Sequence, residues 1–216
     1  LQNVFTKSME VLGGKVDFVL HEIGMALHVK KKIPFDQLNY DYYRKTLYIS
    51  AISFHKMMQI AYNLDAVNDW GSIVALSYIA AQRTLYRYND MADAKALLES
   101  IARSFGYIWG RERNVRVNTI SQSPTKTTAG SGVSGIEALM DFSERMSPLG
   151  NADADDLADY CITLFSDLTR KVTMQNLFHD GGFASMAMSK RAMIQYNKSF
   201  NECTNKDDDE GPVDDF

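Results

Sequence analysis

Apolar positions follow helical spacing in some segments of the chain and form short continuous runs in others, which indicates helices that alternate with buried strands. Residues 1–12 have helical spacing and end at Gly13-Gly14, which predicts a helix followed by its stop. Residues 15–20 follow as a short strand. Residues 36–64 then keep helical spacing without an interior glycine or proline, so a long helix is expected there.

The same rhythm continues through the rest of the chain. Residues 72–77 form a nearly continuous apolar run, the pattern of a strand that is buried on both faces, and this implies a parallel sheet. Strands that alternate with helices predict an α/β fold with a Rossmann-like, doubly wound sheet, in which ligands bind at the carboxyl ends of the strands. The later elements are predicted as helix, strand, helix, helix and strand, over residues 89–109, 115–120, 136–146, 153–167 and 172–178.

The segment from Ser121 to Gly135 is polar and rich in glycine, serine and threonine. It is too long for a plain connection, which favours a mobile loop beside a ligand site. Residues 1–184 are expected to form one partial Rossmann-type domain, and residues 185–205 a carboxyl-terminal extension. Residues 206–216 hold six of the 27 acidic residues and are expected to form a disordered acidic tail.

Composition narrows the class of protein further. Outside the acidic tail the chain has 22 basic and 21 acidic residues, so no broad basic surface is implied and nucleic acid is not an expected partner. No apolar run approaches the roughly 18 residues that a membrane span needs, and no basic-then-apolar leader opens the chain, so a cytoplasmic location is the default expectation. Cys161 and Cys203 fit no redox or metal spacing and are expected to be reduced thiols.

Three short motifs match known binding patterns only in part. Residues 130–135 read G-x-G-x-x-G, but about nine residues separate them from the preceding predicted strand, which favours plain loop flexibility over a phosphate cradle. His21-Glu22 begins the zinc motif H-E-x-x-H, but Met25 stands where the second histidine would be. Gly13-Gly14-Lys15 lacks the upstream glycine and the following Ser or Thr of a P-loop. We therefore expect no metal site.

Candidate chemistry gathers after the buried strand at residues 72–77. Tyr88 and Lys95 are seven residues apart on the next predicted helix, which places them on one face about 10 Å apart along the helix axis. An ammonium group near a phenol lowers the tyrosine pKa, and both groups can hydrogen-bond oxygen atoms of a ligand. Spacing alone leaves open that these side chains only pack the helix or face solvent.

The wider pattern resembles the enoyl-acyl-carrier-protein reductases of the short-chain dehydrogenase/reductase superfamily. The superfamily's usual Tyr-x-x-x-Lys is absent, because Met91 stands four residues before Lys95. Tyr78 followed by Tyr88 and Lys95, as Tyr-x6-Lys, is similar to the arrangement of the enoyl reductases. The resemblance, which is to the Bacteroidetes-type enzymes, covers most of the chain from Val16 to Phe183. It extends to Gly71–Tyr78, Val115–Asn118, Ser123–Thr127, Asp180–Gly182 and His21–Ala26, where Glu22 replaces a serine of the family.

This resemblance implies transfer of a hydride from NADH to a trans-2-enoyl thioester. Tyr88 would hydrogen-bond the carbonyl oxygen of the enolate, a role worth a few kcal/mol in oxyanion sites. Tyr78 would line the substrate side and assist proton delivery, Lys95 would hold the nicotinamide ribose, and Ala26 would border the acyl chain. The remaining cofactor contacts are expected from Ile23, Thr125, Lys126, Thr127, Thr128 and Ala129, and the family's flexible substrate lid from residues 127–146.

The family's glycine-rich cofactor turn and first strands have no counterpart in these 216 residues, and the first residue is Leu1. We therefore expect the chain by itself to bind NADH poorly and to leave one flank of the strand at residues 15–20 unpaired. Two alternatives stay open: another reductase of the superfamily, or an inactive fragment that acts as a binding surface. The implied partners are enoyl-acyl-carrier protein, with Lys30, Lys31 and Lys32 as a docking patch, and further copies of the chain in a homotetramer.

Overall fold

The computed structural model describes residues 1–125 and 136–203, and of residues 201–203 it describes only the helical backbone. A four-stranded parallel sheet forms the centre, in the order β1-β2-β3-β4. This confirms the α/β class and the parallel, Rossmann-like sheet that the apolar runs predict. The strands are β1 (Val16–His21), β2 (Val67–Ser77), β3 (Arg116–Gln122) and β4 (Asn176–His179).

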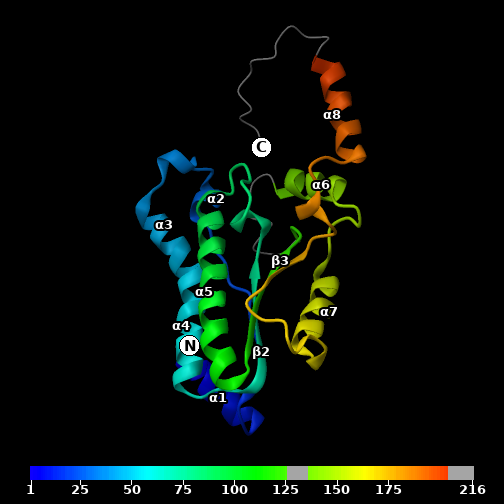
Figure 1. The fold of residues 1–216 in the computed structure, drawn as a ribbon. Helices are drawn as coiled ribbons and strands as arrows, with labels where there is room; N and C mark the ends of the chain where they lie inside the picture. The colour runs from blue at the N-terminus through cyan, green and yellow to red at the C-terminus, as the bar shows by residue number, and fades with distance from the viewer. Residues whose placement is uncertain (126–135, 204–216) are drawn as a thin grey trace.

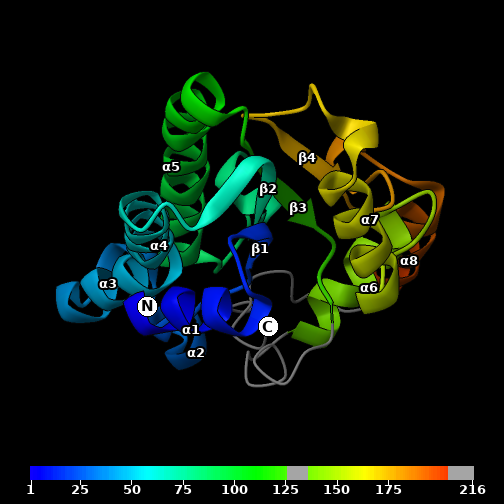
Figure 2. The ribbon, with the colours of Figure 1, turned by 90° about the horizontal axis from the view of Figure 1, so that it is seen from below.

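Helices cover both faces of the sheet, as Figure 2 shows, with α3, α4 and α5 on one side and α6 and α7 on the other. The regular helices are α1 (Gln2–Leu12), α2 (Leu27–Lys31), α3 (Tyr40–Leu47), α4 (Ser53–Asn63), α5 (Asn89–Arg113), α6 (Ile136–Met146), α7 (Ala154–Phe165) and α8 (Lys190–Cys203). Short 3-10 turns lie at Phe35–Gln37, Ile79–Ala81, Asp167–Thr169 and Phe183–Ser185, and a π-helical turn at Tyr48–Ile52.

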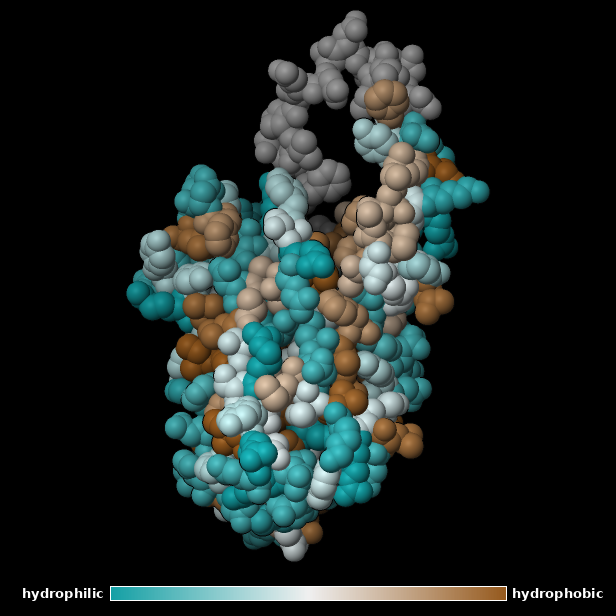
Figure 3. Space-filling model, viewed as in Figure 1, coloured by the Kyte–Doolittle hydropathy of each residue, from teal (hydrophilic) through white to brown (hydrophobic). Residues whose placement is uncertain are grey.

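Alternation along β2 distributes the core between the two faces. Ile73 and Ala75 pack with α4 and α5 in the larger apolar cluster, whereas Val74 packs with Cys161 and Leu164 of α7 in a second cluster. Cys161 is a buried free thiol. Among the described residues, no helix is long and apolar enough to cross a membrane. Figure 3 shows a mostly hydrophilic face with separate hydrophobic groups.

The long helix predicted over residues 36–64 is only partly confirmed. It begins at Tyr40, because the Asn39 side chain accepts hydrogen bonds from the backbone N–H groups of Asp41 and Tyr42 and so caps the helix. The π-helical turn at Tyr48–Ile52 divides it into α3 and α4. The helix predicted over residues 153–167 is α7, and the strand predicted over residues 115–120 is β3. The observed ends of both elements differ from the prediction by one or two residues.

Two strands differ from the sequence prediction at their amino ends. The strand predicted at residues 72–77 begins earlier, at Val67, so Trp70-Gly71 lies inside β2, where Trp70 has a φ of 64° and the register with β1 is irregular. The last strand starts at Asn176 and not at residue 172. Residues 185–205 contain the helix α8, which lies beyond α6 and away from the sheet in Figure 1. The acidic tail predicted at 206–216 lies outside the described residues.

The sheet brings the ends of β1, β2 and β3 to one edge. His21 pairs with Ala75, and Ser77 pairs with Ser121. In the described part of the chain β1 has one neighbouring strand, β2, and its Phe18 and Leu20 are exposed. The segments that follow these strands, including the one with Tyr78, therefore meet at the carboxyl edge where α/β folds bind ligands.

Candidate active site

A cavity of about 730 Å³ lies at the carboxyl edge of the sheet. It is bounded by the segment after β1, the β2–α5 connection, the start of the β3–α6 connection and α6 itself. Apolar side chains of α6 close one side, among them Ile136, Leu139 and Phe142. The site residues predicted from the sequence that line this cavity are Ile23, Tyr78, Tyr88, Lys95 and Thr125.

The β2–α5 connection sets the two tyrosines against each other. Tyr78 follows β2 directly, and Tyr88 is the residue before the first turn of α5. Their ring centroids are 5.0 Å apart, at an interplanar angle of 48°. Arg87 and Asn89, on either side of Tyr88, have positive φ angles of 61° and 43°. Backbone in this region is uncommon for residues other than glycine and is found at functional sites held by their surroundings.

Both phenols are held in the neutral form. Burial, Tyr88 and Asp180 together raise the pKa of Tyr78 well above its usual value. Burial raises the pKa of Tyr88 to about 12. The Tyr78 hydroxyl is buried and has no hydrogen-bond partner among the described residues. At neutral pH each tyrosine therefore offers a hydrogen bond and does not act as a base.

Lys95 is 9% exposed and points from α5 to the end of β2, where its Nζ donates a hydrogen bond of 2.7 Å to the Leu76 carbonyl. Burial lowers the pKa of Lys95 to about 8, against the opposing effects of the Glu22 and Glu99 carboxylates. His21 lies nearby on β1, and burial together with the Lys95 charge lowers its pKa to about 4. Lys95 is thus mainly an ammonium ion at pH 7, beside a neutral histidine.

The segment after β1 contributes only part of what the sequence predicts. Ile23 and Glu22 line the cavity, and Gly24 leaves space near Lys95, since a Cβ there would lie 4.0 Å from the lysine Nζ. Ala26 is half-buried at the amino end of α2 and is not among the residues that line the cavity. Thr125 donates a hydrogen bond to the Ser123 carbonyl. Lys126, Thr127, Thr128 and Ala129 lie outside the described residues, as do residues 127–135 of the lid predicted over residues 127–146.

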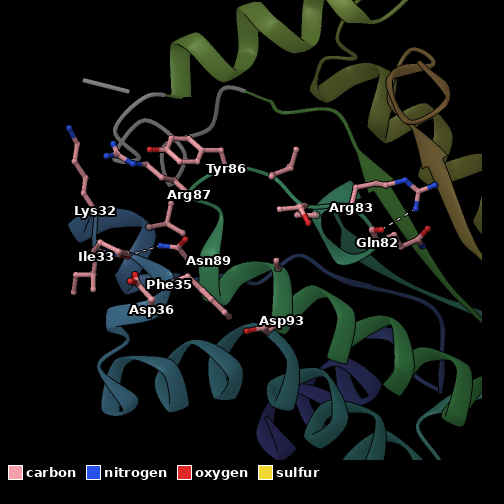
Figure 4. Close-up of a pocket in the computed structure, with 16 residues that line it drawn as sticks. Lys32, Ile33, Phe35, Asp36, Gln82, Arg83, Tyr86, Arg87, Asn89 and Asp93 are labelled. Carbon is pink, nitrogen blue, oxygen red and sulfur yellow. Dashed lines mark hydrogen bonds between the residues drawn. The ribbon is translucent and has the colours of Figure 1, made fainter. Parts of the chain in front are cut away.

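A second cavity of about 700 Å³ adjoins the first (Figure 4). The two share Val29 and the segment Leu85–Arg87 as a common wall. In Figure 4 the Asn89 side chain donates a hydrogen bond to the Ile33 carbonyl, which links the start of α5 to the segment after α2. The charged residues of this cavity include Lys32, Arg83 and Arg87, with Asp36 and Asp93.

Sequence reasoning missed a fully buried pair, His28 of α2 and Asp90 of α5. Their Nδ1 and Oδ2 atoms are 2.7 Å apart. The backbone N–H of Asn39 donates to His28 Nε2, so Nδ1 carries the proton that bonds Asp90. The pair ties α2 to the first turn of α5, two residues after Tyr88. A separation of 62 residues leaves no local signal of this contact.

A parallel sheet with a tyrosine just before, and a lysine on, the helix that follows a central strand resembles the arrangement of the short-chain dehydrogenase/reductase superfamily. The enoyl-(acyl carrier protein) reductase family model matches residues 1–184. The chain therefore belongs to the enoyl-(acyl carrier protein) reductase family.

Individual relatives agree with this assignment. The chain is 33% identical over 176 residues to enoyl-[acyl-carrier-protein] reductase [NADH] 2 of Rhizobium meliloti, covering 81% of this chain and 65% of the relative. It is 32% identical over 183 residues to reductase [NADH] 1 of the same organism, covering 84% of this chain and 66% of the relative. The chain thus spans about two thirds of the length of these curated relatives.

Solved structures give the same family. The crystal structure of a FabI-NADH complex from Alistipes finegoldii matches with a TM-score of 0.87 and 73% identity, over 89% of this chain and 68% of that one. The enoyl-[acyl-carrier-protein] reductase (NADH) from Aquifex aeolicus VF5 matches with a TM-score of 0.79 and 28% identity, over 87% of this chain and 72% of that one.

Proposed function

We propose that this chain carries the catalytic part of an NADH-dependent enoyl-[acyl-carrier-protein] reductase of fatty-acid synthesis. The observation that carries the proposal is the convergence of Tyr78, Tyr88 and Lys95 on one largely apolar cavity at the carboxyl edge of the sheet. At neutral pH the two neutral phenols and the ammonium group can each donate a hydrogen bond to a ligand oxygen, and the apolar walls suit an acyl chain. The relatives named as NADH enoyl-[acyl-carrier-protein] reductases support the assignment.

The donor groups present fit a nicotinamide cofactor. The buried Tyr78 hydroxyl without a described partner, and the Lys95 ammonium group with one hydrogen bond to Leu76, can serve ligand oxygens such as ribose hydroxyls. Ile23 offers an apolar surface beside them. We assign the further cofactor contacts to Thr125 and to the four residues that follow it. When bound, NADH supplies the hydride that reduces the β-carbon of the enoyl thioester.

The residues of this chain stabilise the charge that develops on the substrate. The Tyr88 hydroxyl donates to the thioester carbonyl oxygen, whose negative charge grows as the β-carbon is reduced. Lys95 orients the ribose, and its positive charge favours negative charge on nearby oxygens. Tyr78, 5.0 Å from Tyr88 between ring centroids, lines the substrate side and assists delivery of the proton to the α-carbon. Ala26, the residue before α2, does not line this cavity, and its contact with the acyl chain stays a prediction from the family resemblance.

NADH oxidation with a crotonyl thioester tests the proposal. We compare the chain with a form extended upstream by the strands that the family resemblance implies, and we expect turnover only in the extended form. Micromolar NADH binding by the chain alone would contradict the expected weak binding. Activity on ketoacyl instead of enoyl thioesters would assign the chain to another reductase, and an inert extended form would leave only a binding surface.

We further propose that acyl-carrier protein docks on Lys30, Lys31 and Lys32. All three are exposed at the end of α2, and Lys32 lines the cavity that adjoins the substrate cavity. Since carrier proteins are acidic, reversing the three charges to glutamate should raise the KM for carrier-linked enoyl substrate about tenfold or more at low salt, and leave the KM for a crotonyl thioester without carrier unchanged.

A matched variant with the exposed lysines Lys7, Lys190 and Lys198 reversed has the same net charge but should keep the original KM. The docking proposal is wrong if both triple variants change the carrier-linked KM equally, because the effect would then come from net charge.

We also propose a homotetramer located in the cytoplasm. Tyr107 and Ile108 on α5 are 63% and 41% exposed, and such apolar side chains on one helix suit burial against a second copy. Sedimentation equilibrium of the extended form should give four times the mass of one extended chain. The mass of a single chain would refute the homotetramer.

A further inference from the structure

Glu99 is a buried carboxylate on α5 that neither the spacing of the motif nor the catalytic roles above include. It is 4% exposed. It follows Lys95 by four residues, so both side chains lie on one face of the helix, about 6 Å apart along its axis. An ionised carboxylate with so little exposure is costly unless other groups bond it and balance its charge.

Two hydrogen bonds tie Glu99 to the β2–α5 connection. The hydroxyl of Ser77, the last residue of β2, donates to Oε1 over 2.7 Å. The side-chain amide of Gln82, the residue after the 3-10 turn Ile79–Ala81, donates to Oε2 over 3.1 Å. The Glu99 carboxylate therefore bonds the residues at both ends of the segment Ser77–Gln82, which contains Tyr78. This segment is fixed against the same helix face that carries Lys95.

The charges around Lys95 come from three elements. Glu22 lies after β1 and is exposed, Glu99 lies on α5 and is buried, and both raise the lysine pKa against the effect of burial. His21 on β1 is neutral near pH 7 because its pKa is about 4. Tyr78 and Tyr88 are neutral phenols. Glu22 has the larger of the two carboxylate effects on the Lys95 pKa, and Glu99 adds a second one from a buried position on the same helix.

We propose that Glu99 is a positioning residue of the reductase site, which fixes the Ser77–Gln82 segment against α5 and places a buried carboxylate on the helix face that carries Lys95. The proposal depends on the proposed function only for the roles of Tyr78 and Lys95. The hydrogen bonds and the charge coupling are properties of the chain without cofactor or substrate, and they can be measured in that state.

Competitive labelling with acetic anhydride, followed by mass spectrometry from pH 6 to pH 10, measures the pKa of Lys95 directly. Glu99→Gln removes the charge and keeps the size of the side chain, so the Lys95 pKa should fall by about half a unit to one unit. At pH 7 the labelling of Lys95 should then rise about 3- to 5-fold over the unchanged chain, because the unprotonated fraction of a lysine with a pKa of about 8 rises by that factor. The control is Glu112→Gln on the same helix, whose carboxylate bonds Tyr62; it should leave Lys95 labelling unchanged.

Gln82→Met separates anchoring from charge. It removes one hydrogen bond to Glu99 but leaves the carboxylate ionised, so the Lys95 pKa should stay the same while amide hydrogen exchange over residues 77–82 accelerates. If Glu99→Gln does not fold, this variant still tests the anchoring. Unchanged exchange in Gln82→Met, or Lys95 labelling in folded Glu99→Gln equal to that of the unchanged chain, would overturn the proposal.

In a form that turns over, Glu99→Gln should move the alkaline limb of kcat to lower pH, because the ammonium form of Lys95 is lost above its pKa. A purely structural role would lower kcat at every pH without moving this limb. If the labelling shifts as expected but no enoyl reduction is seen in any form, the proposed function fails while the coupling between Glu99 and Lys95 stands.

Discussion

Replacement of Tyr88 with phenylalanine is expected to lower kcat for enoyl reduction by about 100- to 1000-fold, the loss seen when one oxyanion donor is removed. The ring of Tyr88 packs beside Tyr78, and phenylalanine keeps this contact while removing the hydroxyl. Since the carbonyl oxygen gains its charge only as hydride arrives, the KM for the enoyl thioester should change little. Steady-state kinetics of the form that turns over provide the measurement.

Tyr86→Phe is the matched control for this substitution. Tyr86 lies two residues away on the same connection and also lines the cavity, but its side chain is 71% exposed and no catalytic or binding role is assigned to its hydroxyl. Its kcat should stay within about twofold of the unchanged protein. Equal losses in the two variants would show that the connection tolerates no change, and a normal kcat in Tyr88→Phe would remove Tyr88 from the oxyanion role.

Gly181→Ala is expected to lower the free energy of unfolding by about 2–4 kcal/mol, from positive-φ strain and overpacking together. Gly181 has a φ of 61°, and a Cβ built there would lie only 1.9 Å from the Gly150 carbonyl oxygen. Backbone atoms cannot move aside as a flexible side chain can, so the turn must shift. Urea unfolding followed by circular dichroism measures the change.

Gly14→Ala is the control for glycine replacement, because a Cβ at Gly14 meets no atom within 4 Å and the residue has no positive φ. Its stability should change by less than about 1 kcal/mol. A stable Gly181→Ala protein would show that the two backbone segments are not held as closely as the structure has them. Loss of stability should also disturb the site, since the neighbouring Asp180 contributes to the raised pKa of Tyr78.

The local parts of the site follow from the sequence because neighbouring residues determine them. Tyr88 and Lys95 line one cavity, as their spacing suggests, but the single helix face predicted for them is wrong, because Tyr88 precedes α5 and Asn89 has a φ of 43°. The apolar run of β2 indicates a strand buried on both faces. The position of Glu99 could have been predicted in the same way, because a residue four positions after Lys95 on a helix lies on the same face. The functional role of each residue came from the family resemblance.

The helices α2 and α8 are not predicted from the sequence, and the reason is physical. Five-residue α2 is too short to show a helical period, and its amino end has no side-chain cap. In the extension at residues 185–205, α8 starts where the Ser189 hydroxyl accepts a hydrogen bond from the Ala192 backbone N–H and donates to the Arg145 carbonyl at the end of α6. That second contact joins segments 44 residues apart.

By itself, the sequence determined the class of fold, the order of most helices and strands, and the pairing of Tyr88 with Lys95 near the start of α5, because these depend on side chains within a few residues of one another. Only the tertiary structure decided which distant groups complete the site: His28 against Asp90 across 62 residues, and the joining of Ser77 and Gln82 at Glu99. It also decided the protonation states there, since the pKa values of Lys95 and Tyr88 depend on burial by the whole domain.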